Sequence, residues 1–160
     1  MRLKIITAPV LEPVSLSEAR SQCRVDDTAD DLYLNGLIVA AREVVERESW
    51  RALLTQTLEL SLDAWPRIGE IRLPLPPTQS VTSITWLDEA GAAHVIPAED
   101  YIVGLGGEPA RIVPAPGKWW PSDVLYPVDG IRIRFVAGWT TANLVPSVLR
   151  QATLLLIGHL

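Results

Sequence analysis

The most constraining feature of this 160-residue sequence is a change in the spacing of its apolar residues after Trp50. Before Trp50, apolar residues recur at the helical period in one stripe, namely Leu34, Leu37, Ile38, Ala41, Val44 and Val45. After it, polar residues alternate with Leu58, Leu60 and Leu62, which is typical of a half-buried strand. The chain therefore has to accommodate helices and β-strands in separate stretches.

Two helices are predicted before Trp50. Ser15-Leu16-Ser17-Glu18 fits a capping box, so the first helix begins there and runs to about Arg24. The acidic run 26–31 supplies an N-cap and favourable negative charge to the second helix. On that helix Arg42–Glu46 and Glu43–Arg47 have the i,i+4 spacing, which predicts solvent-facing ion pairs.

The segment after residue 54 is rich in turn-forming residues. Residues 55–139 contain ten of the 13 prolines and eight of the ten glycines. Short strands are expected between these turns, at 57–63, 71–73, 80–87, 94–96, 101–103, 111–113 and 131–135. Their spacing favours an antiparallel sheet or a small barrel.

A last helix is predicted after Pro146. Its expected buried stripe consists of Val148, Leu149, Ala152, Leu155 and Leu156. The sequence reaches Leu160 with no polar cap and no basic last turn, so we expect this helix either to be truncated, the favoured reading, or to be completed by another chain.

Together these elements predict an α+β fold. A small helical bundle, made of two N-terminal helices and one C-terminal helix, would comprise residues 1–54 and 140–160. Residues 55–139 would form an inserted antiparallel β module.

Composition excludes several kinds of function. The net charge of −5 argues against a protein that grips nucleic-acid phosphates. Cys23 is the only cysteine, which excludes an internal disulfide and a multi-cysteine zinc site. With only two histidines we expect no metal, no cofactor and no enzymatic activity. We also expect no secretory signal and no membrane span, and therefore a reducing, cytoplasm-like compartment.

Three motifs with possible chemistry have simpler interpretations. The glycine cluster 104–107 precedes Glu108-Pro109, which places a negative charge where phosphate would bind, so a hairpin loop is favoured. A triad of His94 with Asp88 and Ser80 or Ser83 would make a small hydrolase, but no exposed nucleophile turn is present. The acidic run 26–31 lacks calcium-loop spacing, so helix capping is favoured.

The remaining candidates are interaction residues. Trp119 and Trp120 are adjacent and cannot both point the same way, so one is expected to meet solvent or a partner. Arg132 and Arg134 alternate with apolar residues and would pair with Glu59 across strands, or with another subunit. The predicted interface residues are Trp119, Trp120, Arg132, Arg134, Leu155 and Leu156.

Several segments, taken in order, resemble the head–tail connector proteins of tailed bacteriophages, in the subset with a β insertion. The segments are 16–26, 30–46, 51–57, 71–84, 108–114, Trp120-Pro121, 135–139 and 145–159. The resemblance implies a structural adaptor that forms a ring of about a dozen copies below the portal protein, extends the DNA channel and docks stopper or tail completion proteins. It also implies assembly in the bacterial cytoplasm into a virion, prophage-derived or gene transfer particle.

On this interpretation the chain is a structural component that catalyses no reaction, and duplex DNA passes through the ring without specific binding. The alternative is a stand-alone binding module that uses its tryptophan-rich β surface for a glycan or a peptide. The small hydrolase is a third and weaker hypothesis.

Overall fold

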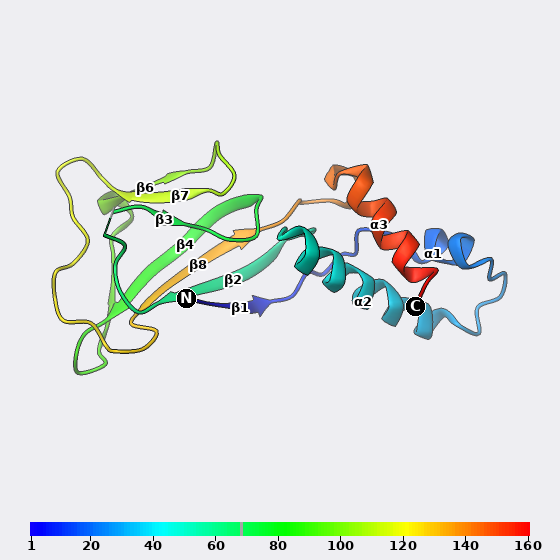
Figure 1. The fold of residues 1–160 in the computed structure, drawn as a ribbon, viewed down its shortest axis with the longest axis horizontal. Helices are drawn as coiled ribbons and strands as arrows, with labels where there is room; N and C mark the ends of the chain where they lie inside the picture. The colour runs from blue at the N-terminus through cyan, green and yellow to red at the C-terminus, as the bar shows by residue number, and fades with distance from the viewer. Residues whose placement is uncertain (68) are drawn as a thin grey trace. The chain divides into compact units, whose positions relative to one another are not determined.

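The computed structural model describes residues 1–67 and 69–160. These residues divide into two compact units, which we call the β unit and the helical unit. The β unit comprises Met1–Ala8 and Gln56–Ala137, and the helical unit comprises Pro9–Thr55 and Gly138–Leu160. Figure 1 shows the strands of the first and the helices of the second. The predicted α+β class is confirmed; the origin of the β-rich stretch 55–139 as an inserted module stays a prediction.

The first helix, α1 (Leu16–Cys23), begins with the predicted capping box. The Ser15 hydroxyl accepts a hydrogen bond from the Glu18 amide at 3.2 Å, and the Ser15 amide donates to the Glu18 carboxylate at 2.7 Å. The helix ends where Arg24 adopts a left-handed conformation with φ 57°.

The second helix, α2 (Asp31–Ser49), starts inside the acidic run. Asp30 occupies the N-cap position, but its side chain forms no capping hydrogen bond. The Asp31 carboxylate forms an ion pair with Arg20 of α1 instead. The acidic run therefore supplies charge at the helix start and ties α2 to α1, while the expected side-chain cap is not made.

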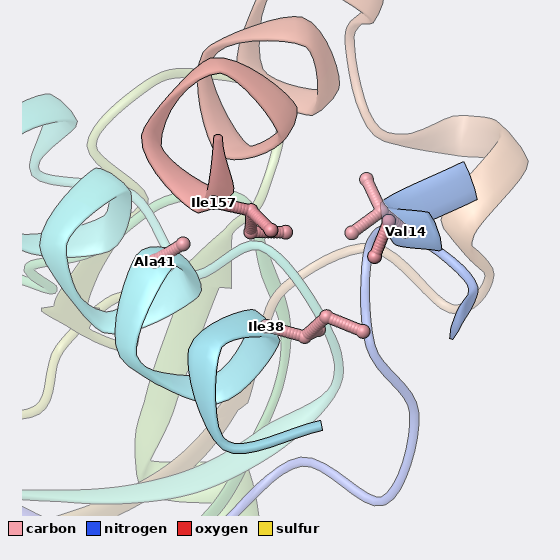
Figure 2. Packing of buried hydrophobic residues seen from close by; sticks show 5 residues of the cluster. Val14, Ile38, Ala41 and Ile157 are labelled. Atoms are coloured by element: carbon pink, nitrogen blue, oxygen red, sulfur yellow. The ribbon is translucent and has the colours of Figure 1, made fainter. Parts of the chain in front are cut away.

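The apolar stripe predicted for α2 forms part of the core of the helical unit. Leu34, Ile38, Ala41 and Val45 are buried, while Leu37 and Val44 are half-buried. Ile38 and Ala41 pack in one cluster with Val14, Ala19 and Ile157 (Figure 2). Val45 packs in a second cluster with Leu53, Leu54 and Val145.

The prediction that Arg42 and Glu46 face solvent is wrong. These side chains belong to residues only 4% and 8% exposed, and they pair at 2.9 Å. Arg42 also pairs with Glu12 at 2.9 Å, and the Glu46 carboxylate accepts from the Leu53 amide at 2.7 Å. The pair is therefore held from two sides, by Glu12 from the segment before α1 and by Leu53 from the segment after α2.

The third helix, α3 (Ser147–Ile157), follows a 3₁₀ turn at Ala142–Leu144. Three residues of its predicted buried stripe, Leu149, Ala152 and Leu156, pack against the core. The prediction is wrong for the other two, because Val148 is 76% and Leu155 58% exposed, whereas Thr153 and Ile157 are buried. The buried Thr153 hydroxyl is satisfied because it donates to the Leu149 carbonyl at 2.9 Å. Apolar residues occur on several sides of α3, so their period does not select the side that meets the core.

A five-stranded antiparallel sheet, in the order β1-β2-β8-β4-β5, dominates the β unit. Its strands are β1 (Arg2–Thr7), β2 (Gln56–Leu62), β4 (Thr78–Leu87), β5 (Ala93–Val95) and β8 (Ile131–Ala137). The sequence analysis did not predict β1 and assigned residues 1–8 to the helical bundle. In the structure these residues belong to the β unit, because β1 pairs with β2.

A second, three-stranded antiparallel sheet has the order β3-β7-β6. Its strands are β3 (Ile71–Arg72), β6 (Tyr101–Gly104), preceded by a 3₁₀ turn at Ala98–Asp100, and β7 (Arg111–Pro114). Gly104 is the last residue of β6, and residues 105–107 of the glycine cluster lie in the connection between the antiparallel strands β6 and β7, as the hairpin interpretation predicted. Fully buried residues of the unit come from both sheets, among them Leu60, Ile84, Ile112, Ile133 and Phe135.

Gly138 begins the return of the chain to the helical unit. Its φ is +101°, and a Cβ atom there would lie 2.1 Å from the Leu54 carbonyl oxygen. Only glycine allows this close approach, which lets Leu54 and Trp139 form a parallel bridge.

Candidate interaction surfaces

The adjacent tryptophans Trp119 and Trp120 have different surroundings. Trp119 is 88% exposed. Trp120 is half-buried, stacks on Trp65 with ring centroids 4.9 Å apart, and donates its indole N–H to the Gly69 carbonyl at 2.9 Å. One ring therefore meets solvent while its neighbour is fixed in the β unit, which is the division the sequence predicted.

An open hollow of about 480 Å³ lies beside the stacked rings. The three tryptophans line it together with Pro66, Arg67, Gly69, Val113, Pro114 and Lys118. Lys118 forms an ion pair with Asp100 at 2.8 Å, and this hydrogen bond raises the pKa of the Lys118 ammonium. The hollow thus combines aromatic faces with cationic groups, a composition suited to stacking or peptide contacts.

Arg132 and Arg134 project from the exposed side of β8, where buried and less buried residues alternate. Arg134 pairs with Glu59 of β2 at 2.9 Å, so the predicted cross-strand pair forms. Arg132 lies opposite Ser61 of β2 and forms no ion pair with another described residue.

Leu155 and Leu156 lie on different sides of α3. Leu156 is half-buried and packs against both clusters of the helical unit. Leu155 instead lines a shallow exposed hollow with Ser147, Val148, Gln151 and Ala152. Only the Leu155 side is available to a partner, and Val148 belongs with it, although the sequence assigned Val148 to the core.

His94 contacts an aromatic ring and a carboxylate. Its ring stacks on Trp86 and contacts the Asp88 carboxylate at 2.9 Å, which lowers the Asp88 pKa. In the sheet register His94 pairs with Trp86, while Ser83 pairs with the exposed Arg134, so serine and histidine lie on opposite faces. The arrangement does not bring a Ser-His-Asp triad together.

The acidic run 26–31 is used in local structure. Asp27 accepts a hydrogen bond from the Ala29 amide at 2.9 Å, and Asp31 pairs with Arg20. Within residues 1–67 and 69–160, no group of three or more His, Cys, Asp or Glu side chains is placed to hold a metal ion. The same residues include no helix long and apolar enough to cross a membrane.

Comparison with known proteins shows which proteins this chain is similar to. Residues 13–85 match the family of phage gp6-like head–tail connector proteins. The resemblance to head–tail connectors is confirmed. No curated protein sequence matches the chain significantly.

Similarity to solved structures extends over nearly the whole chain. A chain from the neck of an empty gene transfer agent (GTA) particle, computed with C6 symmetry, is 25% identical with a TM-score of 0.83. A chain from the virion of a native GTA particle is 26% identical with a TM-score of 0.81. Each alignment covers 99% of this chain and 83% of the other. A chain from the neck of a native GTA particle, computed with C12 symmetry, is 26% identical with a TM-score of 0.75, covering 99% and 82%.

These matches support the structural role predicted from the sequence and a setting at the head–tail junction of a phage-like particle. Head–tail connectors are structural proteins, so the prediction that the chain is not an enzyme is confirmed. The six interface residues remain predictions. Sequence reasoning missed Trp65, whose only signal is its place in a tryptophan-rich stretch, and Val148, which it assigned to the core.

Proposed function

We propose that this chain is a ring-forming adaptor in the neck of a phage-like particle. About twelve copies would assemble below the portal, extend the channel through which DNA passes, and offer a surface to stopper or tail proteins. A ring requires each copy to present two different surfaces that complement each other.

The observation that carries the proposal is the similarity of 99% of this chain to chains in GTA necks computed with C6 and C12 symmetry. A ring of twelve identical copies satisfies both symmetries, because six-fold rotation is contained in twelve-fold rotation.

Two exposed apolar surfaces support the assembly. The Leu155 side of α3 presents Val148 and Leu155 to solvent, and Trp119 is the most exposed aromatic ring beside the hollow. Exposed apolar groups next to such hollows are typical of surfaces that a partner covers.

The direct test is electron microscopy of the full chain mixed with portal rings from the same kind of particle. We expect a second ring of density against the portal, and co-migration of the two proteins in size-exclusion chromatography. If the chain neither binds portal rings nor forms rings alone at high concentration, the adaptor proposal is wrong.

The tryptophan-lined hollow favours a second candidate function, binding of a glycan or a peptide by the isolated chain. Trp119→Ala leaves the Trp65–Trp120 stack in place, so it isolates the exposed ring. A saturable change in tryptophan fluorescence with one ligand of a glycan or peptide panel, lost in Trp119→Ala, would support this candidate. A flat response across the panel would reject it.

A further inference from the structure

The exposed face of the five-stranded sheet has an ordered pattern of side chains. Residues paired across neighbouring strands share a face. One row runs Arg2, Ser61, Arg132, Thr85 across β1, β2, β8 and β4, and the next row runs Lys4, Glu59, Arg134, Ser83. Ser61 is buried beneath its neighbours, and β5 ends the first row with the exposed Val95 opposite Thr85. We call the eight residues on β1, β2, β8 and β4 the basic face.

The basic face has the opposite charge balance to the chain as a whole. It holds four of the 14 basic residues and one of the 19 acidic residues of a chain whose net charge is −5. The cations stand on β1 and β8, two strands apart, which separates them by about 10 Å across the sheet and about 7 Å along each strand. The spacing along each strand is shorter than the Debye length of about 8 Å at physiological salt, whereas the spacing across the sheet matches the Debye length of about 10 Å at 0.1 M salt. The four charges therefore act together on an anion most strongly at low salt.

Among the residues that the structure describes, two of the four cations lack a carboxylate partner. Arg2 pairs with Asp129 at 3.0 Å and Arg134 pairs with Glu59 at 2.9 Å. Within the described ranges, neither Lys4 nor Arg132 forms an ion pair, and both residues are exposed. Their charges are therefore available to a ligand.

The side chains of the basic face are better suited to bind phosphate groups than to bind another protein. Protein interfaces are anchored by aromatic or large apolar side chains. The eight positions include none, and the apolar neighbour that the register adds, Val95, lies at the β5 edge, away from the cations on β1 and β8. Contacts to a nucleic-acid backbone use arginine, lysine, serine and threonine, which make up seven of the eight residues. An extended polyanion also matches a flat, repeated array better than a single small anion does.

We propose that the basic face binds the phosphate backbone of duplex DNA through sequence-independent contacts that weaken with salt. The inference rests on the proposed function, because that function supplies the DNA: it is the DNA that passes through the neck of the particle. Negative charge on the remainder of the chain limits the affinity, so the contact would guide DNA without arresting it.

The test uses the full chain and a fluorescently labelled 30-base-pair duplex of mixed sequence. Fluorescence anisotropy is measured between about 25 and 200 mM NaCl, a range over which phosphate contacts weaken strongly. We expect wild-type binding to fall steadily with salt. Arg132→Glu and Lys4→Glu should each weaken binding on the order of tenfold at the lowest salt, and Arg132→Gln should reduce the salt slope by about one.

Arg47→Glu is the matched control, because Arg47 is an exposed residue of α2 and the substitution changes net charge by the same amount. The inference fails if Arg47→Glu weakens binding as much as Arg132→Glu does, or if wild-type protein does not bind at the lowest salt. It also fails if polyglutamate of equal charge binds as tightly as the duplex, since the face would then suit an acidic protein.

Thermal melting checks that each variant remains folded. Ring assembly on the portal is a separate measurement, so the two proposals can fail independently. An Arg132→Glu protein that forms rings but does not bind DNA would support both.

Discussion

Helices α2 and α3 both contribute to the core of the helical unit, but they distribute their apolar residues differently. α2 buries one stripe, from Leu34 to Val45, and its most exposed apolar residues, Leu32 and Tyr33, lie in its first turn. α3 buries Thr153 and Ile157 and leaves Val148 and Leu155 in solvent. The core accounts for the stripe of α2. It accounts for only part of the apolar surface of α3, so the rest is free for an assembly contact.

The largest effect is expected from a charge in the α2 stripe. Val45→Asp would bury an unpaired carboxylate against Leu53 and Val145, and should cost upward of about 4 kcal/mol, enough to unfold a marginally stable chain. Urea denaturation followed by circular dichroism measures this. Leu37→Asp, at a half-buried position of the same stripe, should cost distinctly less. Equal losses would contradict the difference in burial between the two positions.

The next effect concerns the buried ion pair of α2. Glu46→Ala would leave Arg42 with Glu12 as its remaining close partner and the Leu53 amide without its acceptor, at a cost of about 3–5 kcal/mol. Glu43→Ala is the control, because Glu43 is exposed and 3.8 Å from Arg42, and should change stability by less than about 0.5 kcal/mol. Similar losses in the two variants would contradict the burial of the pair.

Substitutions at two neighbouring leucines of α3 distinguish a role in the core from a role in assembly. Leu156→Ala should cost about 2–3 kcal/mol because Leu156 packs on both clusters. Leu155→Ala should leave the melting temperature nearly unchanged and reduce ring or portal binding. If Leu155→Ala binds portal rings as wild type does, the exposed side of α3 is not an assembly surface.

The smallest effect is a pH dependence at the contact between α1 and α3. The backbone N–H of Ser15, its hydroxyl and Arg150 lower the Glu18 pKa below its ordinary value of 4.5. A lowered pKa stabilises the folded protein above about pH 4.5, and this contribution is lost as pH falls through the folded-state pKa. Glu18→Gln should therefore be less stable than wild type at pH 7, by under about 1 kcal/mol, with the gap shrinking toward pH 3. A constant gap would contradict this assignment.

Local signals predicted the parts of the fold that depend on neighbouring residues. The capping box at Ser15 and the stripe of α2 each lie within a few turns of chain, and both are found in the structure. The pairing of Arg134 with Glu59 followed from strand alternation once β2 and β8 were assigned.

The features that were missed depend on residues far apart in sequence. β1 is a strand because Arg2–Thr7 pairs with β2, more than 50 residues later. Trp120 is held by Trp65, and no local pattern joins them. The i,i+4 spacing of Arg42 and Glu46 is the same for an exposed as for a buried pair, so spacing could not predict their burial. Net charge likewise said nothing of the basic face, because it sums over the whole chain.

The bridge between Leu54 and Trp139 has a practical consequence for dissecting the protein. The Thr55 amide donates to the Trp139 carbonyl at 3.1 Å. The two places where the chain leaves and re-enters the helical unit, Thr55 and Gly138, are therefore close together. Replacing residues 56–137 by a linker of a few residues would keep that unit continuous. The deletion must also remove residues 1–8, which would otherwise remain as an orphan strand without β2 and with an apolar side open to aggregation.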